Sequence, residues 1–183
     1  PGWRHCEHVI IASGEDRAAA DPLAAAGLSW TYGAPIMLVQ QERVPASVIN
    51  ALSAIAAANG GAVTVHVVGG PVSVPNERLA EIVSGVPGAV TFDRILDTGN
   101  RFDLAAAIAR RMELERPGGQ TDLPASGRFA LIANGADEEK FFDALALSPI
   151  AAANGYPILL VNEDSIPAAT QGALTDLALT ERV

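Results

Sequence analysis

An α/β fold, in which a mostly parallel β-sheet is layered by helices, is the class that this sequence predicts. Apolar runs of about five residues alternate with longer helical segments, which is the pattern of βαβ units. Hydrophobic residues make up 49% of the chain and aromatic residues only 5%, so small aliphatic side chains are available for packing helices on a sheet. The third observation is that the same order of elements occurs twice.

The repeat relates residues 9–39 to residues 130–161. In both segments an apolar run ends in Gly, an acidic patch and an Ala-rich helix follow, and Gly-x-Pro opens a second apolar run. The matched positions, each shifted by 122, include Asp21 with Asp143, Gly33 with Gly155, and Pro35 with Pro157. A period of about 120 residues is much longer than a solenoid repeat, so it indicates tandem duplication of a domain-sized unit.

The repeat also predicts the domain boundaries. We expect a complete first module over residues 9–116 and an incomplete second module over residues 129–183. Residues 117–128 lie between them, and their Gly and Pro content without hydrophobic periodicity is typical of a linker. The second module is predicted to lack a third strand, because nothing after residue 161 matches the apolar run at 63–68. The surface that this leaves open favours a homo-oligomer or packing against further modules.

Helix-capping residues and turn residues delimit the elements of the first module. Asp21 can cap a helix, Pro22 fits a first helical turn, and Gly33 suits a helix end. The predicted elements are strands at 9–13, 35–39, 63–68 and, briefly, 90–92, with helices at 21–32, 45–58, 75–85 and 102–115. In the second module we expect strands at 129–133 and 157–161 and helices that begin at 143 and at 167.

Charge and composition exclude several classes of function. The net charge of −9 argues against nonspecific nucleic-acid binding, which needs a basic face. No apolar run reaches the ~18 residues of a membrane-spanning helix, so membrane insertion is not expected. Cys6 is the single cysteine, so the chain can form no intrachain disulfide.

No catalytic residue, metal site or cofactor is predicted. The fingerprints of dinucleotide-binding and phosphate-binding loops are missing, and no Ser/His/Asp or Cys/His set recurs in both copies. His5, Cys6 and His8 are close in sequence, but no second cluster completes a metal site. His66 lies within a predicted strand, where a packed core histidine is a more common role than a catalytic base. Asp21 and Asp143 are explained by helix capping, with a role in a site as the alternative.

Two further features carry open alternatives. Gly69-Gly70 directly follows a strand, so it forms either a tight turn or an anion site built from backbone N–H groups. Arg94 and Arg101 flank a turn ahead of a helix. They either pair with nearby acidic residues or clamp a phosphate or carboxylate group of a ligand.

Taken in order, these segments resemble the bacterial cell wall binding repeat 2 family. The matching segments read IIASG (10–14), DPLA (21–24), GAPIMLV (33–39), VHVVGGPVSV (65–74) and RILDTGNRFDLAAAIA (94–109). The second copy supplies LIANG (131–135), DALA (143–146) and GYPILLV (155–161). The resemblance implies Toprim-like (flavodoxin-like) βαβ modules that occur in tandem and act as a noncovalent anchor on the bacterial surface.

The resemblance also implies a ligand and its site. The ligand would be an anionic cell-wall polysaccharide or a teichoic-acid-like polymer, and the protein would be extracellular. The residues that carry over are Arg94, Arg101, Pro35, Ile36, Met37, Leu38, Pro157, Ile158, Leu159 and Leu160, to which we add Gly69 and Gly70.

Three functions are therefore weighed. The leading one is a noncatalytic module that anchors an exported bacterial protein to an anionic cell-wall glycopolymer. The second is an α/β enzyme or a nucleotide-type ligand binder that uses Asp21, Asp143 or His66 in a cleft at the strand ends. The third is a structural or oligomerisation spacer. A buried Asp–His pair in a pocket beside residues 40–44 and 69–73 would favour the second.

Overall fold

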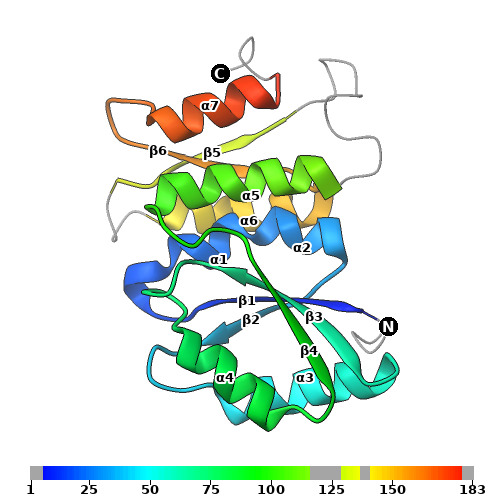
Figure 1. Ribbon diagram of the computed structural model, residues 1–183. Coiled ribbons are helices and arrows are strands. Elements are labelled where there is room, and N and C mark those ends of the chain that lie inside the picture. Colours follow the sequence, from blue (N-terminus) through cyan, green and yellow to red (C-terminus); the bar gives the residue numbers. More distant parts are fainter. Residues whose placement is uncertain (1–5, 116–128, 137–140, 179–183) are drawn as a thin grey trace.

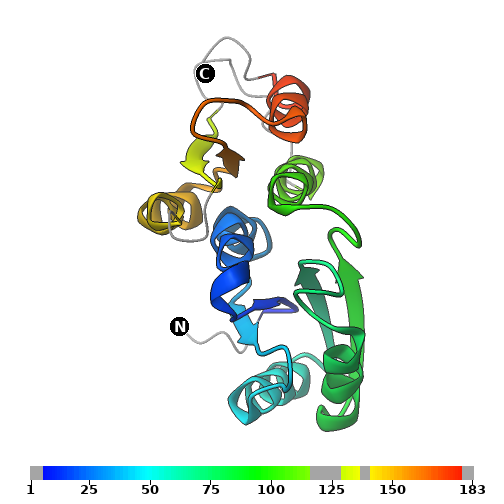
Figure 2. The same ribbon diagram turned by 90° about the vertical axis from the view of Figure 1, so that its left-hand side faces the viewer.

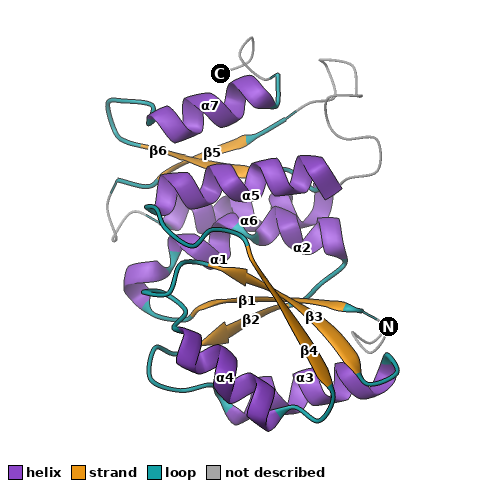
Figure 3. Cartoon of the chain, viewed as in Figure 1, coloured by secondary structure: helices purple, strands orange, loops and turns teal. Residues whose placement is uncertain are grey.

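The computed structural model describes residues 6–115, 129–136 and 141–178. Figure 1 shows two sheets with helices between them and on their outer sides, and Figure 3 separates the helices, strands and loops by colour. All strand pairs are parallel, which confirms the predicted α/β class with a mostly parallel sheet.

The first sheet has four strands in the order β2-β1-β3-β4. Their bounds are β1 His8–Ser13, β2 Ile36–Val39, β3 Ala62–Val68 and β4 Ala89–Arg94. Strand β1 lies in the middle, where Ile10 is paired with Ile36 of β2 on one side and with His66 of β3 on the other. Every strand thus runs toward the same edge of the sheet, and the loops that follow β1, β2 and β3 gather there.

Helices cover both faces of this sheet. Helices α3 (Ala46–Ala58) and α4 (Asn76–Gly85) pack on one face over an aliphatic core that includes Val9, Ile11 and Val65. The other face carries a short 3-10 helix, η2 (Asp16–Ala18), then α1 (Ala20–Ala24), α2 (Ala26–Tyr32) and α5 (Arg101–Glu115).

The second copy contributes two strands and two helices to the described residues. They are β5 (Leu131–Asn134), β6 (Ile158–Val161), α6 (Phe142–Asn154) and α7 (Ala168–Asp176). Figure 2 shows α7 beside α5, with α6 on the opposite side of the small sheet and next to α1 and α2. None of the helices in these described ranges is long and apolar enough to cross a bilayer.

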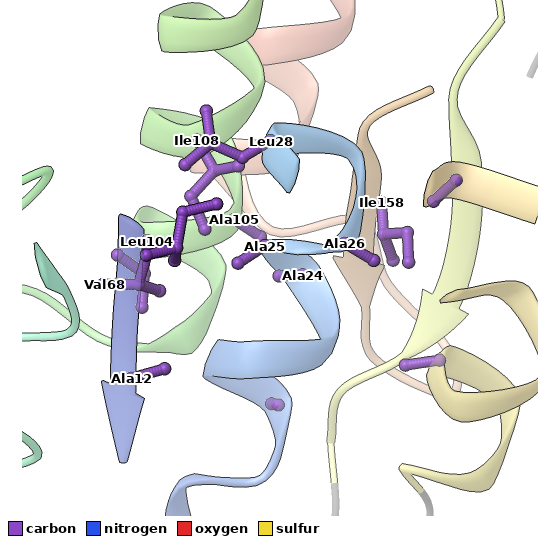
Figure 4. Packing of buried hydrophobic residues seen from close by; sticks show 14 of the residues in the cluster. Ala12, Ala24, Ala25, Ala26, Leu28, Val68, Leu104, Ala105, Ile108 and Ile158 are labelled. Atoms are coloured by element: carbon purple, nitrogen blue, oxygen red, sulfur yellow. The ribbon is translucent and has the colours of Figure 1, made fainter. Parts of the chain in front are cut away.

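The largest core joins the two copies. It runs from Ala12 and Val68 of the first sheet, through α1, α2 and α5, to Ile158 of β6 (Figure 4). Alanines of α1 and α2 lie at its centre, and their small side chains let the helices approach closely. Gly27 of α2 lies so close to the Tyr156 carbonyl that a Cβ there would clash. The low aromatic content seen in the sequence therefore serves helix packing between the copies.

The predicted capping role of Asp21 and Asp143 is wrong. Helix α1 begins at Ala20 after the turn of η2, its N-cap is Ala19, and no side chain caps it. In α6 the N-cap is Phe141, again without a side-chain cap. Both helices are entered from residues that already have helical backbone angles, so each Asp falls in the first turn and its carboxyl is available for other contacts.

Two other elements differ in extent from the prediction. The single helix expected at 21–32 is divided at Ala25 into α1 and α2. Strand β4 runs over six residues, longer than the brief strand at 90–92, because its whole length pairs with β3. Gly33 and Gly155 both end their helices in the left-handed region, with φ of 59° and 68°, as the shared turn signal predicted.

Candidate functional site

A glycine-rich loop at the carboxyl end of β3 forms the centre of the candidate site. Gly69 has a φ of 110°, which side-chain-bearing residues rarely adopt. At Gly70 a Cβ would lie 2.7 Å from the Asp97 carbonyl, so the loop passes close to the segment that leads into α5. Both glycines are therefore required by backbone conformation or by close approach.

The side chain of Arg94 holds this loop in place through hydrogen bonds. Its guanidinium donates to the Gly69 carbonyl at 2.5 Å and to the Val74 carbonyl and the Asn76 side chain at 3.0 Å each. It also lies 3.6 Å from a carboxylate oxygen of Asp97. These contacts engage both terminal nitrogens of Arg94 within the protein, so its contacts indicate a positioning role for the loop.

Asp21 extends from α1 toward the same loop and is only 7% exposed. Its carboxylate lies close to the Ser73 hydroxyl and next to Gly69. Burial raises the pKa of Asp21 to about 6, against the opposing effects of the Ser73 hydrogen bond and the positive charge of Arg101. A carboxyl that is costly to bury and that caps no helix is a marker of a functional site.

Asp21, Ser73 and Arg101 line a cavity of about 70 Å³. The remaining walls are formed by Gly70, Leu96, Thr98, Gly99, Asn100 and Leu104. Hydroxyl, carboxylate, amide and guanidinium groups thus converge on one small polar space at the carboxyl end of the first sheet. In a parallel sheet this is the edge at which ligands usually bind.

Arg101 is the first residue of α5 and links the cavity to the second copy. Its guanidinium donates to the Gly135 carbonyl, in the turn after β5, at 3.4 Å. It also lines a second, narrower cavity between the copies, together with Asp16, Asn134 and Leu160. Through Arg101, the Asp21 cavity therefore adjoins the junction of the two copies.

The other arginines of the stretch between residues 94 and 116 that lie in the described ranges are held in ion pairs. Arg111 contacts Asp93, and Arg110 lies 2.6 Å from Asp176 of α7. These pairs attach α5 to the first sheet and to the second copy.

The predicted ligand segments around Pro35 and Pro157 occupy different environments. In β6 the side chains of Ile158, Leu159 and Leu160 are 0%, 0% and 1% exposed. In β2, Leu38 is 47% exposed, and the neighbouring residues Pro35, Ile36 and Met37 are partly buried. The β6 segment packs against α5, α6 and α7, so its ligand role stays a prediction while its packing role is visible.

The structure does contain an Asp–His pair, formed by buried His66 and partly exposed Asp93. This pair does not line the open cavity that is formed by Glu15 and residues 40–43. Nor does it line the Asp21 cavity. Among the described residues no three His, Cys, Asp or Glu side chains gather as a metal would require. The pocket that would have favoured an enzyme is therefore not formed by this pair.

Sequence reasoning missed Ser73, Thr98 and Asn100 as lining residues. Each follows a segment that was singled out, Ser73 after the glycine pair and the other two between Arg94 and Arg101. Their convergence depends on where α5 docks, which is a long-range property.

A parallel α/β scaffold, duplicated in tandem and carrying a polar cavity at the junction of its copies, defines the class as a tandem ligand-binding module. Comparison with known proteins identifies the family. The chain matches the model of the protein family described as "Cell wall binding domain 2 (CWB2)" over residues 3–78 and 96–180, and it belongs to this family. It is a cell-wall-binding module of the bacterial surface.

Individual relatives agree with this assignment. The chain is 30% identical over 164 residues to N-acetylmuramoyl-L-alanine amidase LytC of Bacillus subtilis (strain 168), covering 90% of this chain and 28% of that protein. Cwp6 from Clostridium difficile has a similar structure, with a TM-score of 0.74, 28% identity, and coverage of 96% of this chain and 24% of Cwp6. Cwp8 from the same organism shares the fold, with a TM-score of 0.62, 23% identity, and coverage of 92% and 25%. The chain thus spans about a quarter of the length of these relatives.

Proposed function

We propose that this module binds an anionic, teichoic-acid-like glycopolymer of the bacterial cell wall, and that the Asp21 cavity receives part of it. The observation that carries this proposal is the convergence of Arg101, Asp21, Ser73 and Gly70 at the junction of the copies. The loop that supplies two of these groups is held in place by Arg94 before any ligand arrives. Such pre-organisation lowers the cost of binding.

The chemistry of the cavity suits a sugar phosphate better than a bare anion. Arg101 provides the planar donor that phosphate and carboxylate groups prefer. Asp21, when ionised, is an acceptor for a hydroxyl group, and Ser73 and Thr98 can donate or accept. A volume of about 70 Å³ holds one hydroxyl or phosphate group rather than a whole sugar ring, so the polymer would lie across the rim.

We also propose that the module anchors a larger exported protein and that any catalytic activity lies outside this chain. The family is one of binding domains, and the chain covers only 28% of the amidase that it resembles.

We also propose that a further module of the same family packs on the exposed faces of α6 and β2. Phe142 and Leu145 of α6 are 65% and 50% exposed. At the shift of 122 positions they correspond to Ala20, which is buried at the junction of the copies, and Leu23, which is partly buried there. Leu38 is open where its counterpart Leu160 is covered. The exposed faces of α6 and β2 are thus the two halves of one junction, which makes a homologous module the best-fitting occupant.

Co-sedimentation with Gram-positive cell walls tests the proposed ligand. The assay compares intact walls with walls treated with hydrofluoric acid, which cleaves phosphodiester-linked polymers. At 0.15 M salt, where the Debye length of about 8 Å screens the net charge of −9, the protein should pellet only with intact walls. Failure to pellet with intact walls contradicts wall binding, and equal pelleting with both contradicts the anionic polymer.

Sedimentation velocity tests the packing proposal on the purified chain. We expect concentration-dependent association that Leu145→Glu abolishes, because a charge would then be buried in the new junction. The matched control Leu114→Glu changes a residue that is 78% exposed on α5 and should leave association unchanged. A chain that stays monomeric at all concentrations contradicts association between separate molecules.

A further inference from the structure

A second polar cluster crosses the first sheet near the amino-terminal end of β1. We call it the histidine network. Its members come from five different elements and are His8 (β1), Tyr32 (α2), His66 (β3), Asp93 (β4) and Arg111 (α5). None of them lines the Asp21 cavity.

The contacts of the network form a continuous chain. His8 Nδ1 lies 3.0 Å from His66 Nε2, and His66 Nδ1 lies 3.1 Å from an Asp93 carboxylate oxygen. Both Asp93 oxygens accept from Arg111, one of them at 3.3 Å. The Tyr32 ring stacks on His66 with 3.9 Å between ring centroids, and His66 is only 3% exposed. The network therefore ties α5 to the buried middle of the first sheet.

The pairing of hydrogen-bond donors with acceptors determines which nitrogen atoms of the histidine network carry a proton. Asp93 is ionised, since burial alone would raise its pKa but Arg111 and His66 hold it below its usual value. His66 must then donate from Nδ1, which leaves Nε2 as an acceptor. His8 must accordingly donate from its own Nδ1 to His66. The hydrogen bonds thus require an Nδ1–H group on each histidine.

The hydrogen bonds of the histidine network can accommodate one additional proton but not two. A single added proton on Nε2 of His8 leaves every hydrogen bond of the network in place. A second proton on His66 would set two N–H groups of two cations against each other across 3.0 Å. Burial, together with the charges of His8 and Arg111, lowers the pKa of His66, although Asp93 acts in the opposite direction.

The remaining titratable neighbours do not relieve this conflict. The Tyr32 hydroxyl is next to Arg111, and burial raises its pKa, so it stays neutral in acid. Glu115 lies 4.0 Å from Arg111 and belongs to the same helix, and no hydrogen bond joins it to either histidine in the described residues.

We propose that the histidine network is an acid-sensitive latch, which holds α5 on the first sheet at neutral pH and releases it when both histidines are charged. Helix α5 carries Arg101 at its first residue and packs against β6 and α7 of the second copy. Release of α5 would open the junction and displace Arg101 from Asp21. Acid would then weaken polymer binding. This consequence rests on the proposed function, whereas the latch itself does not depend on that function.

The tautomers provide the first test. Long-range ¹H–¹⁵N correlation spectra of the ¹⁵N-labelled chain at pH 7.5 should show both His8 and His66 in the Nδ1–H form. Free histidine in water prefers the Nε2–H form, so a His8 signal of that kind would overturn the proposed chain of hydrogen bonds.

The second test compares the pH dependence of unfolding in the unmodified chain and in His8→Gln. A Gln amide can donate to neutral His66 or, after rotation, accept from its protonated form. The unmodified folded chain should bind one proton fewer than its unfolded state in acid. Its unfolding equilibrium constant should then rise more steeply between pH 6 and pH 5 than that of the variant, in which His66 faces no second cation. Asp21 titrates in both chains, so its contribution cancels in the comparison.

A variant on the same helix controls for loss of any ion pair on α5. Arg110→Gln removes the pair with Asp176 but leaves the network intact, so its pH dependence should match that of the unmodified chain. Hydrogen exchange, corrected for the intrinsic effect of pH, should show α5 losing protection at pH 5 while α3 keeps it. Equal pH slopes for His8→Gln and the unmodified chain, or equal protection of α5 at both pH values, would overturn the latch. If His8→Gln does not fold, the tautomers and the exchange data on the unmodified chain decide the question.

Discussion

Strands β2 (Ile36–Val39) and β6 (Ile158–Val161) occupy equivalent places in the two copies, and their sequences IMLV and ILLV are nearly the same. In β6 the first three side chains are at most 1% exposed, whereas Leu38 of β2 is 47% exposed. The difference arises from what packs on each strand. Strand β6 is covered by α5, α6, α7 and α1, and β2 is covered on one face by α3 while its other face is partly open.

This comparison shows that the shared Pro-Ile-x-Leu segment is a packing surface whose exposure is decided by the neighbouring module. Where two modules meet, the segment is buried, and its Leu160 lines the narrow cavity that Arg101 shares. Where no neighbour is present, the segment is open. The family resemblance places the ligand role on both segments, but the structure gives them unequal access to a polymer.

The sharpest test of this difference uses one substitution at two matched positions. Leu160→Ala removes a side chain that is 1% exposed, so it should lower the free energy of unfolding by about 2–5 kcal/mol. Leu38→Ala at the equivalent half-exposed position should cost less than about 1 kcal/mol. Urea denaturation measures both values, and similar losses at the two sites would contradict the unequal packing.

The close approach of the copies predicts a smaller effect. A Cβ at Gly27 would clash with the Tyr156 carbonyl and lie 2.6 Å from Met112 Cε, so Gly27→Ala must push α2 away from the second copy. We expect a loss of about 1–3 kcal/mol in the free energy of unfolding. Gly172→Ala is the control, because only the flexible Arg110 side chain lies near its Cβ, at 3.1 Å. That change should stabilise helix α7 by up to about 1 kcal/mol. A neutral Gly27→Ala would show that the copies are not tightly packed.

Asp21 and Asp143 offer a comparison that depends on pH. The folded-state pKa of Asp21, about 6, lies above the value of about 3.9 for an unfolded chain, so its ionised form lowers stability at neutral pH. This cost is absent below pH 4 and grows as the pH rises through 6. Asp21→Asn should therefore raise the free energy of unfolding at pH 7 by about 1–3 kcal/mol and lose this advantage by pH 4. Unfolding curves at both pH values measure the difference.

The matched change Asp143→Asn alters an exposed residue and should stay within about 0.5 kcal/mol at either pH. A destabilising Asp21→Asn at pH 7 would mean that Asp21 serves the fold rather than a ligand.

Most of the scaffold could be predicted from the sequence because its signals are local. The predicted bounds of the main strands and helices agree with the structure to within a few residues. They came from the apolar runs, the prolines, Gly33 and Gly155. The division of the first helix at Ala25 could not be predicted, because it depends on how α1 and α2 pack against α6. The capping role of Asp21 failed for the same kind of reason, since the turn of η2 before it already has helical geometry.

The site was only partly predictable. Gly70 and Arg101 were predicted and line one cavity, and Gly69 was predicted and lies beside Asp21 and Ser73, whereas Asp21 was assigned mainly to capping. Arg94 was expected at the ligand; its contacts fix the loop, and its ligand role stays a prediction. The domain boundary at residue 116 stays a prediction. We propose to assign α5 to the second module, because it packs against β6 and α7 and the second family match begins at residue 96.

One measurement tests the central claim, that the junction cavity binds the wall polymer. It compares the dissociation constants of the unmodified chain, Arg101→Gln and Arg110→Gln for intact cell walls at 0.15 M salt. Both variants lose one positive charge from α5, but only Arg101 lines the cavity. Loss of a charge-assisted hydrogen bond should raise the dissociation constant of Arg101→Gln by about 10- to 100-fold. The constant for Arg110→Gln should stay within about twofold of the unmodified value. Equal constants for the two variants would contradict the account.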